Sequence, residues 1–277
     1  MSALGNPWSQ DQDKMNSFLT LTTDFGQGDF DAGVLAGVIW SIAPAAQIAD
    51  LSHEIERHNV LEAALLLERC TPYFPAGTIH VVVVDPGVGT QRRAIAARLG
   101  AQRYVCPDNG IITLVRQRAL SANQPVELVH LNQPRYWLPN VSHIFHGRDV
   151  FAAAAGHLAA GIPLAELGER IDDAVLLEFL APERTPQGWR GAVVHVDAFG
   201  NLSTNLSVSE LQGAVVRTVN IGDAQITGLA RTFGDKKPGE LTALFDSSEK
   251  LCISVVNGSA AARLGSRVGE AVEVALE

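Results

Sequence analysis

The chain has 277 residues, 47% of them hydrophobic and 18% charged, a balance typical of a globular protein that can bury a sizeable core. Its formal net charge of −9 argues against a nucleic-acid partner, because phosphate binding needs clustered lysine and arginine. Neither a run of about 18 consecutive apolar residues nor a lysine run occurs, so we expect no membrane span and no membrane-surface patch. A small-molecule ligand suits this composition.

The three cysteines, Cys70, Cys106 and Cys252, lie far apart and form no CxxC pair. We therefore expect free thiols in a reducing cytoplasm, with neither disulfides nor a structural zinc site. Residues 1–17 are polar and lack the apolar core of a signal peptide, which predicts a flexible tail.

The first part of the chain alternates between strand and helix patterns. A β-branched run at 18–25 predicts the first strand, and helices are expected at 31–42, 59–70 and 150–161. Further strands are expected at 47–52, 78–85 and 102–110, and the nearly all-apolar strand 78–85 is typical of a sheet buried on both faces. The alternation predicts an α/β domain with a largely parallel sheet over residues 18–168.

The pattern changes after residue 168. Residues 169–190 contain prolines and a PQG turn, which indicates a linker. Short strand patterns follow at 191–197, 215–223, 224–230, 240–246 and 250–256, without a long helix between them. They predict a smaller all-β, barrel-like domain over residues 191–277.

Polar residues gather where the strands of the first domain are expected to end. Asp24, Asp85 and Asn109 stand at the ends of expected strands, His53 follows one, and His146 precedes an expected helix. In open α/β sheets, ligands bind beyond the carboxyl ends of the strands. We therefore expect a site at this edge of the sheet.

Asp85 ends the valine strand of VVVVDPGVGTQRR (81–93). A buried carboxylate needs a partner, and the glycine-bearing turn can return Arg92 to it and hold it ionised. Arg93 is expected to be a solvated surface charge instead. His146, beside the small Gly147, titrates near neutrality and is a candidate proton acceptor for water.

Two other turns have both a structural and a binding interpretation. Asp24 and Phe25 form either a helix cap or a carboxylate and ring that bind a ribose diol. The turn with Asp197, Phe199 and Asn201 is either a polar hairpin or a cradle for adenine or an amino acid. NGSAA (257–261) is a second turn of this kind.

Several motifs match one family together, in this order: TTDFG (22–26), DLSHEI (50–55), FPAGTIHVVVVDPGVGTQRR (74–93), PDNG (107–110), FHGRDVFA (145–152), DAFGN (197–201) and the NGSA turn. Over roughly residues 18–275 the chain resembles the S-adenosyl-L-methionine hydroxide adenosyltransferase family, which is related to fluorinating and chlorinating enzymes. The resemblance implies attack of water, as hydroxide, on C5′ of the substrate ribose, with release of adenosine and methionine. It implies no cofactor and no metal.

The resemblance places the catalytic triad of the family on Asp85, Arg92 and His146. It implies substrate contacts in both domains, at Asp24, Phe25, Asn109, Asp197, Phe199, Asn201, Ser247, Asn257 and Ser259. It also implies a homotrimer with each site between the α/β domain of one subunit and the β domain of the next. The chain departs from the family pattern at Asp31 and His58, which bears on substrate affinity.

Other functions stay open from the residues alone. The halogenating relatives lack the aspartate and histidine found here as Asp85 and His146, which disfavours halide chemistry. A metal-dependent hydrolase could use the polar residues at the strand ends as ligands. A sensor that binds adenosine or S-adenosylmethionine without turnover is the third alternative.

Overall fold

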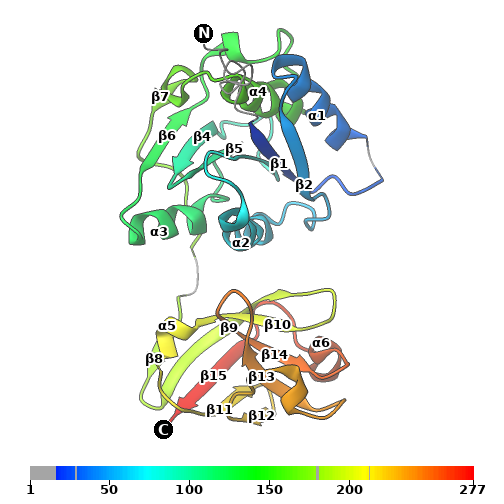
Figure 1. The fold of residues 1–277 in the computed structure, drawn as a ribbon, viewed down its shortest axis with the longest axis vertical. Coiled ribbons are helices and arrows are strands. Elements are labelled where there is room, and N and C mark those ends of the chain that lie inside the picture. Colours follow the sequence, from blue (N-terminus) through cyan, green and yellow to red (C-terminus); the bar gives the residue numbers. More distant parts are fainter. Residues whose placement is uncertain (1–16, 29, 179–180, 212) are drawn as a thin grey trace, which may run out of the picture. The chain divides into compact units, whose positions relative to one another are not determined.

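A computed structural model describes residues 17–28, 30–178, 181–211 and 213–277; the expected tail at 1–17 lies outside them except for Ser17. The chain divides into two compact units, Met1–Leu177 (unit 1) and Glu178–Glu277 (unit 2). Figure 1 shows an α/β architecture for unit 1 and strands for most of unit 2.

Unit 1 is built around one sheet with helices on both of its faces. Its strands are β1 (Phe18–Thr23), β2 (Gln47–Ser52), β3 (Ile79–Val83), β4 (Ala94–Leu99), β5 (Gln102–Pro107), β6 (Val126–His130) and β7 (Glu169–Arg170). Its helices are α1 (Asp31–Ile42), α2 (Val60–Cys70), α3 (Thr113–Ser121), α4 (Ala153–Ala159), a π-helix (Gly147–Ala152), and 3₁₀ turns at Thr71–Tyr73, Pro134–Tyr136 and Leu164–Glu166.

The strand order of this sheet is β2-β1-β3-β5-β4-β6-β7. Strands β2, β1, β3 and β5 are mutually parallel, whereas β4 is antiparallel to both of its neighbours. The sequence pattern missed β4, which returns directly from the loop after β3 without the crossover helix that a parallel strand needs. The predicted α/β fold class with a largely parallel sheet is confirmed.

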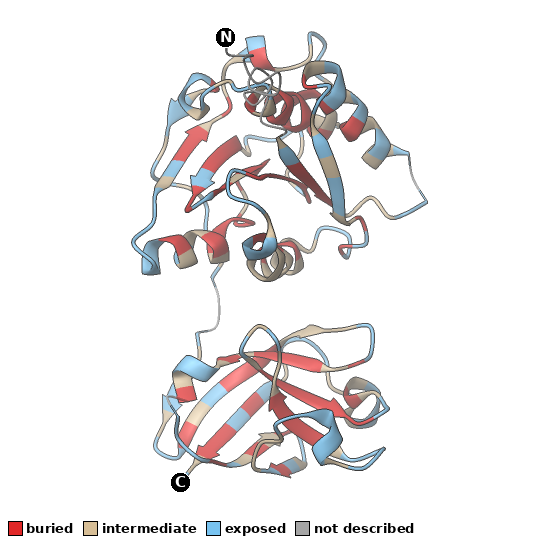
Figure 2. Cartoon of the chain, viewed as in Figure 1, coloured by how far each residue is buried: buried red, intermediate tan, exposed pale blue. Residues whose placement is uncertain are grey.

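The valines at the end of β3 and directly after it explain why unit 1 has three layers, with one sheet between two layers of helices. Val81 and Val83 belong to the apolar cluster under α1 and α4, whereas Val82 and Val84 belong to the cluster under α2 and α3. Because successive side chains of a strand point to opposite faces, a run of valines is buried on both. Figure 2 shows these central strands as buried.

Unit 2 is an antiparallel sheet with the path β12-β11-β15-β9-β10-β14-β13, and β8 pairs with β9. The backbone N–H of Ala230, just beyond β12, donates to the carbonyl of Ala243 in β13 at 2.8 Å, which links the two ends of the path. The predicted barrel-like domain is therefore confirmed. The elements are β8 (Glu183–Thr185), β9 (Gly188–Val196), β10 (Leu202–Ser207), α5 (Val208–Leu211), β11 (Val216–Ile221), β12 (Ala224–Thr227), β13 (Leu241–Phe245), β14 (Lys250–Val255), α6 (Ala260–Leu264), β15 (Ala271–Leu276) and a 3₁₀ turn at Phe233–Asp235.

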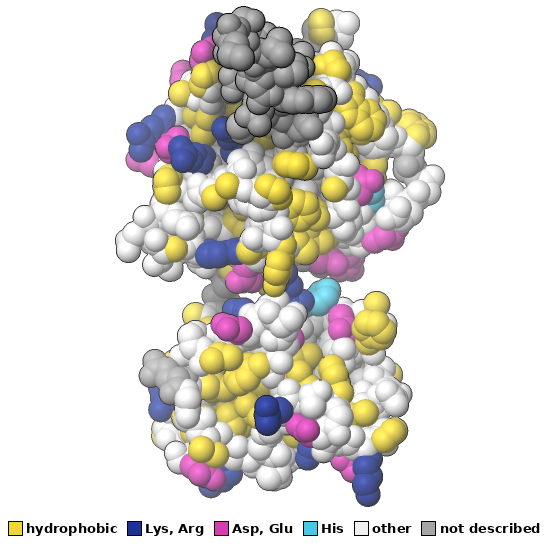
Figure 3. Space-filling view, viewed as in Figure 1, with side chains coloured by type: hydrophobic (Ala, Val, Ile, Leu, Met, Phe, Trp, Pro, Cys, Tyr) yellow, Lys and Arg dark blue, Asp and Glu magenta, His cyan; other side chains and the backbone are white. Residues whose placement is uncertain are grey.

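The segment expected to be a linker, 169–190, carries regular structure at both ends. Its first residues form β7 in the sheet of unit 1, and its last residues form β8 and the start of β9 in unit 2. No helix in the described part of the chain is long and apolar enough to cross a membrane. On the face drawn in Figure 3, basic side chains are interspersed with acidic ones.

Candidate active site

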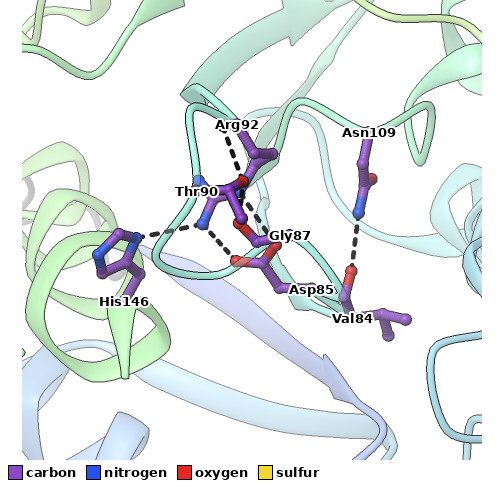
Figure 4. A network of polar contacts seen from close by, with 7 residues as sticks. All are labelled: Val84, Asp85, Gly87, Thr90, Arg92, Asn109 and His146. Carbon is purple, nitrogen blue, oxygen red and sulfur yellow. Dashed lines mark hydrogen bonds and ion pairs between the residues drawn. The ribbon is translucent and has the colours of Figure 1, made fainter. Parts of the chain in front are cut away.

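The loop after β3 turns back on itself at the carboxyl edge of the sheet. Val88 N–H donates to the Asp85 carbonyl at 3.2 Å, and the Thr90 hydroxyl donates to the Gly87 carbonyl at 2.7 Å. The same hydroxyl oxygen accepts from Arg92 N–H at 3.2 Å. These local bonds bring Arg92 back over Asp85, as the sequence predicted (Figure 4).

Two glycines in this loop allow close approach. A Cβ on Gly87 would lie 3.1 Å from Cβ of Arg92, so a side chain at this position would crowd the returning Arg92. Gly89 has φ +75°, and a Cβ there would lie 2.5 Å from the carbonyl oxygen of His143. The loop is therefore packed against the segment that carries His146.

Asp85 and Arg92 form a two-pronged ion pair. Arg92 Nε donates to Asp85 Oδ1 at 3.0 Å, and Arg92 Nη2 donates to Asp85 Oδ2. Their side chains are only 6% and 7% exposed, respectively, so water screens the pair weakly. The Arg92 guanidinium also lies over the Phe151 ring at 5.3 Å, and its Nη1 is buried without a hydrogen-bond partner among the described residues.

Arg92 also determines the state of His146. Arg92 Nη2 lies 3.2 Å from His146 Nδ1, and a guanidinium can only donate, so Nδ1 presents its lone pair and the neutral ring carries its proton on Nε2. Burial, and then the charge of Arg92, lower the pKa of His146 below its ordinary value of 6.5. The hypothesis that His146 accepts a proton from water stays a prediction; in the tautomer that fits this contact, Arg92 engages Nδ1 and Nε2 presents a proton to a ligand.

His146 directly precedes the π-helix, which is held by a buried carboxylate. Asp149 has no exposed surface, and it accepts from Ser142 N–H at 2.7 Å and from Arg148 Nε at 2.6 Å. Gly147 lets the helix approach β3, since a Cβ there would lie 2.9 Å from Val83. Short π-helical segments often mark functional sites, and His146 is the residue directly before this one.

Asp24 and Phe25 lie just past β1, on a loop tied to the segment after β2. Asp24 Oδ2 accepts from the N–H of His58 at 2.9 Å, and Gly26 N–H donates to the His53 carbonyl at 2.7 Å. The ring of Phe25 packs edge-on against Phe145, with 6.0 Å between the centroids. One oxygen of Asp24, Oδ1, has no hydrogen-bond partner in the described residues.

A cavity of about 280 Å³ joins these groups within unit 1. Three of the predicted site residues on its wall are Asp24, Asp85 and His146, from three different loops. The whole described lining is Asp24, Phe25, Arg57, His58, Val83, Asp85, Val88, Ile144, Phe145, His146 and Gly147.

Asn109 and Arg93 serve the framework instead of lining the cavity. Asn109 Nδ2 donates to the Val84 carbonyl at 2.9 Å, which braces the end of β3. Arg93 donates to Asp108 Oδ2 at 2.9 Å and to Asp173 Oδ1 at 2.7 Å. The expectation that Arg93 is a solvated charge is wrong, because the antiparallel return of β4 points it at the buried Asp108.

Most of the predicted contacts in unit 2 lie around the turn after β9. Asp197 Oδ1 accepts from the N–H groups of Phe199 and Asn201 at 2.9 and 2.8 Å, and Asp197 Oδ2 accepts from Asn201 Nδ2 at 2.8 Å. Ser259 caps α6 at 3.1 Å and touches this turn, since a Cβ on Gly200 would lie 2.0 Å from Ser259 Oγ. The Phe199 ring is 78% exposed.

Asn257 and Ser247 lie at opposite ends of β14. Asn257 follows this strand in a left-handed conformation, with φ 55°, next to Ser259. Ser247 precedes the strand, in the exposed turn after β13. Six strand residues span about 20 Å, so Ser247 is separated from the rest of the cluster.

Three of the side chains proposed as alternative metal ligands, those of His53, Asp85 and Asn109, have other partners. Thr23 Oγ1 contacts His53 Nδ1 at 2.9 Å, and His53 Nε2 lies 3.2 Å from Asp50 Oδ1. Asp85 is paired with Arg92, and Asn109 binds backbone. Within the described ranges, no group of three or more His, Cys, Asp or Glu side chains gathers to hold a metal ion.

Two residues near the cavity were missed from the sequence. Asp149 stands in the FHGRD string, which served only as a family motif and gave this residue no role at the site. Arg57 follows a glutamate in an exposed segment, and no sequence motif marks it as a site residue. Its place on the cavity wall depends on how that segment packs against the loop of Asp24.

Comparison with known proteins gives consistent results for both units. Residues 19–168 match the model of the SAM hydroxide adenosyltransferase N-terminal domain, and residues 191–273 match that of its C-terminal domain. A crystal structure of an uncharacterized conserved protein from Thermotoga maritima superposes with a TM-score of 0.83 at 35% identity, covering 92% of this chain and 99% of that one.

Two names occur among the similar curated proteins. The (R)-S-adenosyl-L-methionine hydrolase of Salinispora tropica is 36% identical over 93% of this chain and 97% of its own length, and the Thermus thermophilus protein of that name is 37% identical over 91% and 97%. A fluorinase from an Actinoplanes species is 26% identical over 72% of this chain and 74% of its own. The chain therefore belongs to the SAM hydroxide adenosyltransferase family.

Proposed function

We propose that this protein hydrolyses S-adenosyl-L-methionine to adenosine and L-methionine without a metal or cofactor. The observation that carries the proposal is the Asp85–Arg92–His146 network beside the cavity of unit 1. The match to both family domains and the names of the relatives support the choice of substrate.

The reaction needs a nucleophile but no acid for the leaving group. Water gives one proton to solvent, and a lone pair of the resulting hydroxide forms a bond to C5′ of the ribose. The C5′–S bond breaks, and its electron pair neutralises the sulfonium as methionine departs. The protein's task is to stabilise and orient the hydroxide in a site with little water.

Each member of the network has a distinct part in that task. His146 Nε2–H donates to the hydroxide, and the nearby guanidinium of Arg92 favours its negative charge. Asp85 orients Arg92 through two hydrogen bonds and balances its charge. Because the pKa of His146 is lowered, the ring stays neutral at pH 7 and keeps this orientation.

Substrate binding is proposed to use residues of both units. Asp24 Oδ1 is available for a ribose hydroxyl, and Phe25 offers an aromatic wall. At about 280 Å³ the cavity is at the small end for a ligand site and suits the nucleoside part of the substrate. Unit 2 would contribute Phe199 and Asn201 to the substrate site. Its further substrate contacts would be Asp197, Ser247, Asn257 and Ser259.

We also propose a cytoplasmic homotrimer in which unit 2 of a neighbouring subunit supplies those contacts. The family resemblance suggests it, and two large apolar side chains support it: Ile144 on the cavity rim is 82% exposed, and Phe199 is 78% exposed. The three thiols are free, which suits a reducing compartment. The molar mass in solution, from light scattering, tests the trimer.

The first experiment incubates chelator-treated protein with S-adenosylmethionine, without halide, and separates the products by chromatography. Equal amounts of adenosine and methionine above the no-enzyme control are expected. Binding of substrate without product would indicate a sensor, and activity that returns only with added metal would indicate a metal-dependent hydrolase. Either result would overturn the proposal.

The state of His146 has its own test. In ¹⁵N NMR of histidine-labelled protein, His146 should be the neutral Nε2–H tautomer at pH 7. An Nδ1–H tautomer would contradict the role of Arg92 as donor to Nδ1 and would restore Nε2 as a proton acceptor.

A further inference from the structure

A buried histidine outside the catalytic network contacts the loop that carries Asp24. His53 follows β2 and is 5% exposed, and Thr23 ends β1 with no exposed surface. The two side chains meet between His53 Nδ1 and Thr23 Oγ1, which lie 2.9 Å apart. Neither residue is among the described lining of the cavity, so this contact can act on the site only through a residue that does line it.

A shift in strand pairing brings these two residues together. Leu21 of β1 lies opposite Asp50 of β2, whereas the next residue of β1 lies opposite Ser52. One residue of β2 is therefore skipped, as in a β-bulge, and such irregularities re-aim side chains beside functional sites. Continued by one residue, the shifted pairing sets Thr23 opposite His53, in agreement with their side-chain contact.

The direction of the hydrogen bond between the two side chains follows from their neighbours. The N–H of Phe25 donates to Thr23 Oγ1 at 3.3 Å, which leaves the hydroxyl proton of Thr23 to donate to His53 Nδ1. If Nδ1 carried a proton instead, the buried hydroxyl proton would have no acceptor among the described residues. The neutral ring therefore carries its proton on Nε2, which lies 3.2 Å from Asp50 Oδ1 but is not aligned for a hydrogen bond. As an acceptor, His53 fixes the side-chain rotamer of Thr23.

The same threonine closes the turn that carries Asp24. The bond from Phe25 N–H to Thr23 Oγ1 spans Asp24, so a rotation of the threonine side chain would open the turn on which this carboxylate stands. His58 N–H holds Asp24 Oδ2 at 2.9 Å, and Oδ1 stays available to a ligand in the cavity. The contact between the buried histidine and the threonine therefore determines how firmly Asp24 is held on the cavity wall.

The fold supports this loop independently of the His53 ring. Gly26 N–H donates to the backbone carbonyl of His53 at 2.7 Å, and this bond remains whatever side chain stands at that position. Beside it, Gln27 N–H donates to Glu54 Oε1 at 2.8 Å. A change of the His53 side chain should therefore loosen the turn around Asp24 without detaching the loop.

We propose that His53 is a positioning residue for the ribose of the substrate. It accepts the hydroxyl proton of Thr23 and so keeps Asp24 placed to bind the ribose diol. The inference rests on the proposed function, which assigns the nucleoside part of the substrate to the cavity of unit 1. Because His53 acts through Asp24 and not on the ligand itself, its loss should weaken ligands that have the diol more than ligands that lack it.

The test measures nucleoside binding by calorimetry in His53→Leu and His53→Asn. Leucine cannot accept the Thr23 proton, so adenosine should bind about fivefold more weakly, with 2′,3′-dideoxyadenosine within about twofold of the wild type. Asparagine offers its Oδ1 close to the position of the ring Nδ1, and it should restore adenosine binding to within about twofold of the wild type. Thr23→Val should weaken adenosine as His53→Leu does, and the double variant should bind no more weakly than either.

His80→Leu is the matched control. His80 is also a buried histidine, and its Nδ1 contacts the hydroxyl of a buried threonine of β1, Thr20, at 2.7 Å. Thr20 lies inside β1 and not at the loop of Asp24. His80→Leu should therefore lower stability and leave the preference for adenosine over 2′,3′-dideoxyadenosine unchanged.

Three results in variants that are folded by circular dichroism overturn the inference. They are an equal loss of affinity for both nucleosides in His53→Leu, no loss for either, and no recovery in His53→Asn. A wild type that does not prefer adenosine overturns it as well, because Asp24 would then not bind the diol. A wild type that shows the preference but releases no adenosine from S-adenosylmethionine contradicts only hydrolysis, so the two proposals fail separately.

Discussion

Two consecutive arginines end in two different kinds of site. Arg92 pairs with Asp85, contacts His146 and keeps a buried nitrogen without a partner among the described residues. Arg93 binds the buried Asp108 and the carboxylate and carbonyl of Asp173. The first network retains donors that a ligand can use, whereas the second binds one part of the fold to another.

The difference teaches how an ion pair relates to function. A carboxylate pair is by itself weak evidence for a catalytic role, since both arginines have one. What distinguishes Arg92 is a histidine whose lone pair it occupies and a cavity that both Asp85 and His146 line. Variants of the two arginines should therefore affect different measurements.

The largest expected effect is on turnover in Arg92→Ala. Without the guanidinium, the hydroxide loses its cation and His146 loses the donor that orients it, so kcat/KM should fall on the order of 1,000-fold. Arg92→Lys should recover little, since an ammonium cannot keep the paired contacts to Asp85 and the contact to His146. Adenosine release, with folding checked by circular dichroism, measures this; near-normal turnover in a folded variant would refute the assigned role.

Arg93→Ala should lower stability instead. The side chain of Asp108 is 1% exposed, and removing its partner leaves a buried charge, which costs about 3 kcal/mol in the free energy of unfolding. Urea unfolding measures the loss, and activity below the transition should stay within about threefold. Arg98→Ala, from a half-exposed pair with 3.8 Å between its charged atoms, should cost about 0.5 kcal/mol or less.

A smaller effect on activity is expected from Asp149→Asn. The amide loses the ion pair with Arg148 and holds the 142–149 segment less well, so kcat/KM should fall about tenfold through misplacement of His146. Because the charge of Asp149 raises the pKa of His146, its removal should also move the acid limb of the pH profile downward. A loss of stability with unchanged kinetics and an unchanged profile would make Asp149 purely structural.

The smallest expected effect is that of pH on the wild type. The active form has neutral His146, because a proton on Nδ1 would face the Arg92 donors, and burial and Arg92 lower its pKa. Activity is therefore retained as pH falls through 6.5 and is lost only below that, so kcat/KM should change less than about twofold between pH 6.5 and 8. Asp85→Asn, which removes a charge that raises this pKa, should move the limb to lower pH. An acid limb of the kcat/KM profile with its midpoint at or above pH 6.5 would contradict the environment proposed for His146.

The amino-acid pattern alone predicted much of this protein. Because side-chain periodicity and turn residues are local properties, they predicted the two fold classes, the buried strand before Asp85 and the return of Arg92 through a glycine turn. The order of polar residues at the strand ends placed Asp24, Asp85 and His146 at one edge, and all three line one cavity. The family resemblance was based on sequence motifs that contain these same residues.

The tertiary structure decided what depends on contacts between distant segments. Only packing shows that β4 returns antiparallel and turns Arg93 inward, that the buried Asp149 binds Ser142 N–H, and that Arg57 lies on the cavity wall. The tautomer of His146 likewise follows from a contact across 54 positions of the chain. Local sequence patterns carry no information on such pairs, because the residues next to each partner in the chain are compatible with many different tertiary contacts.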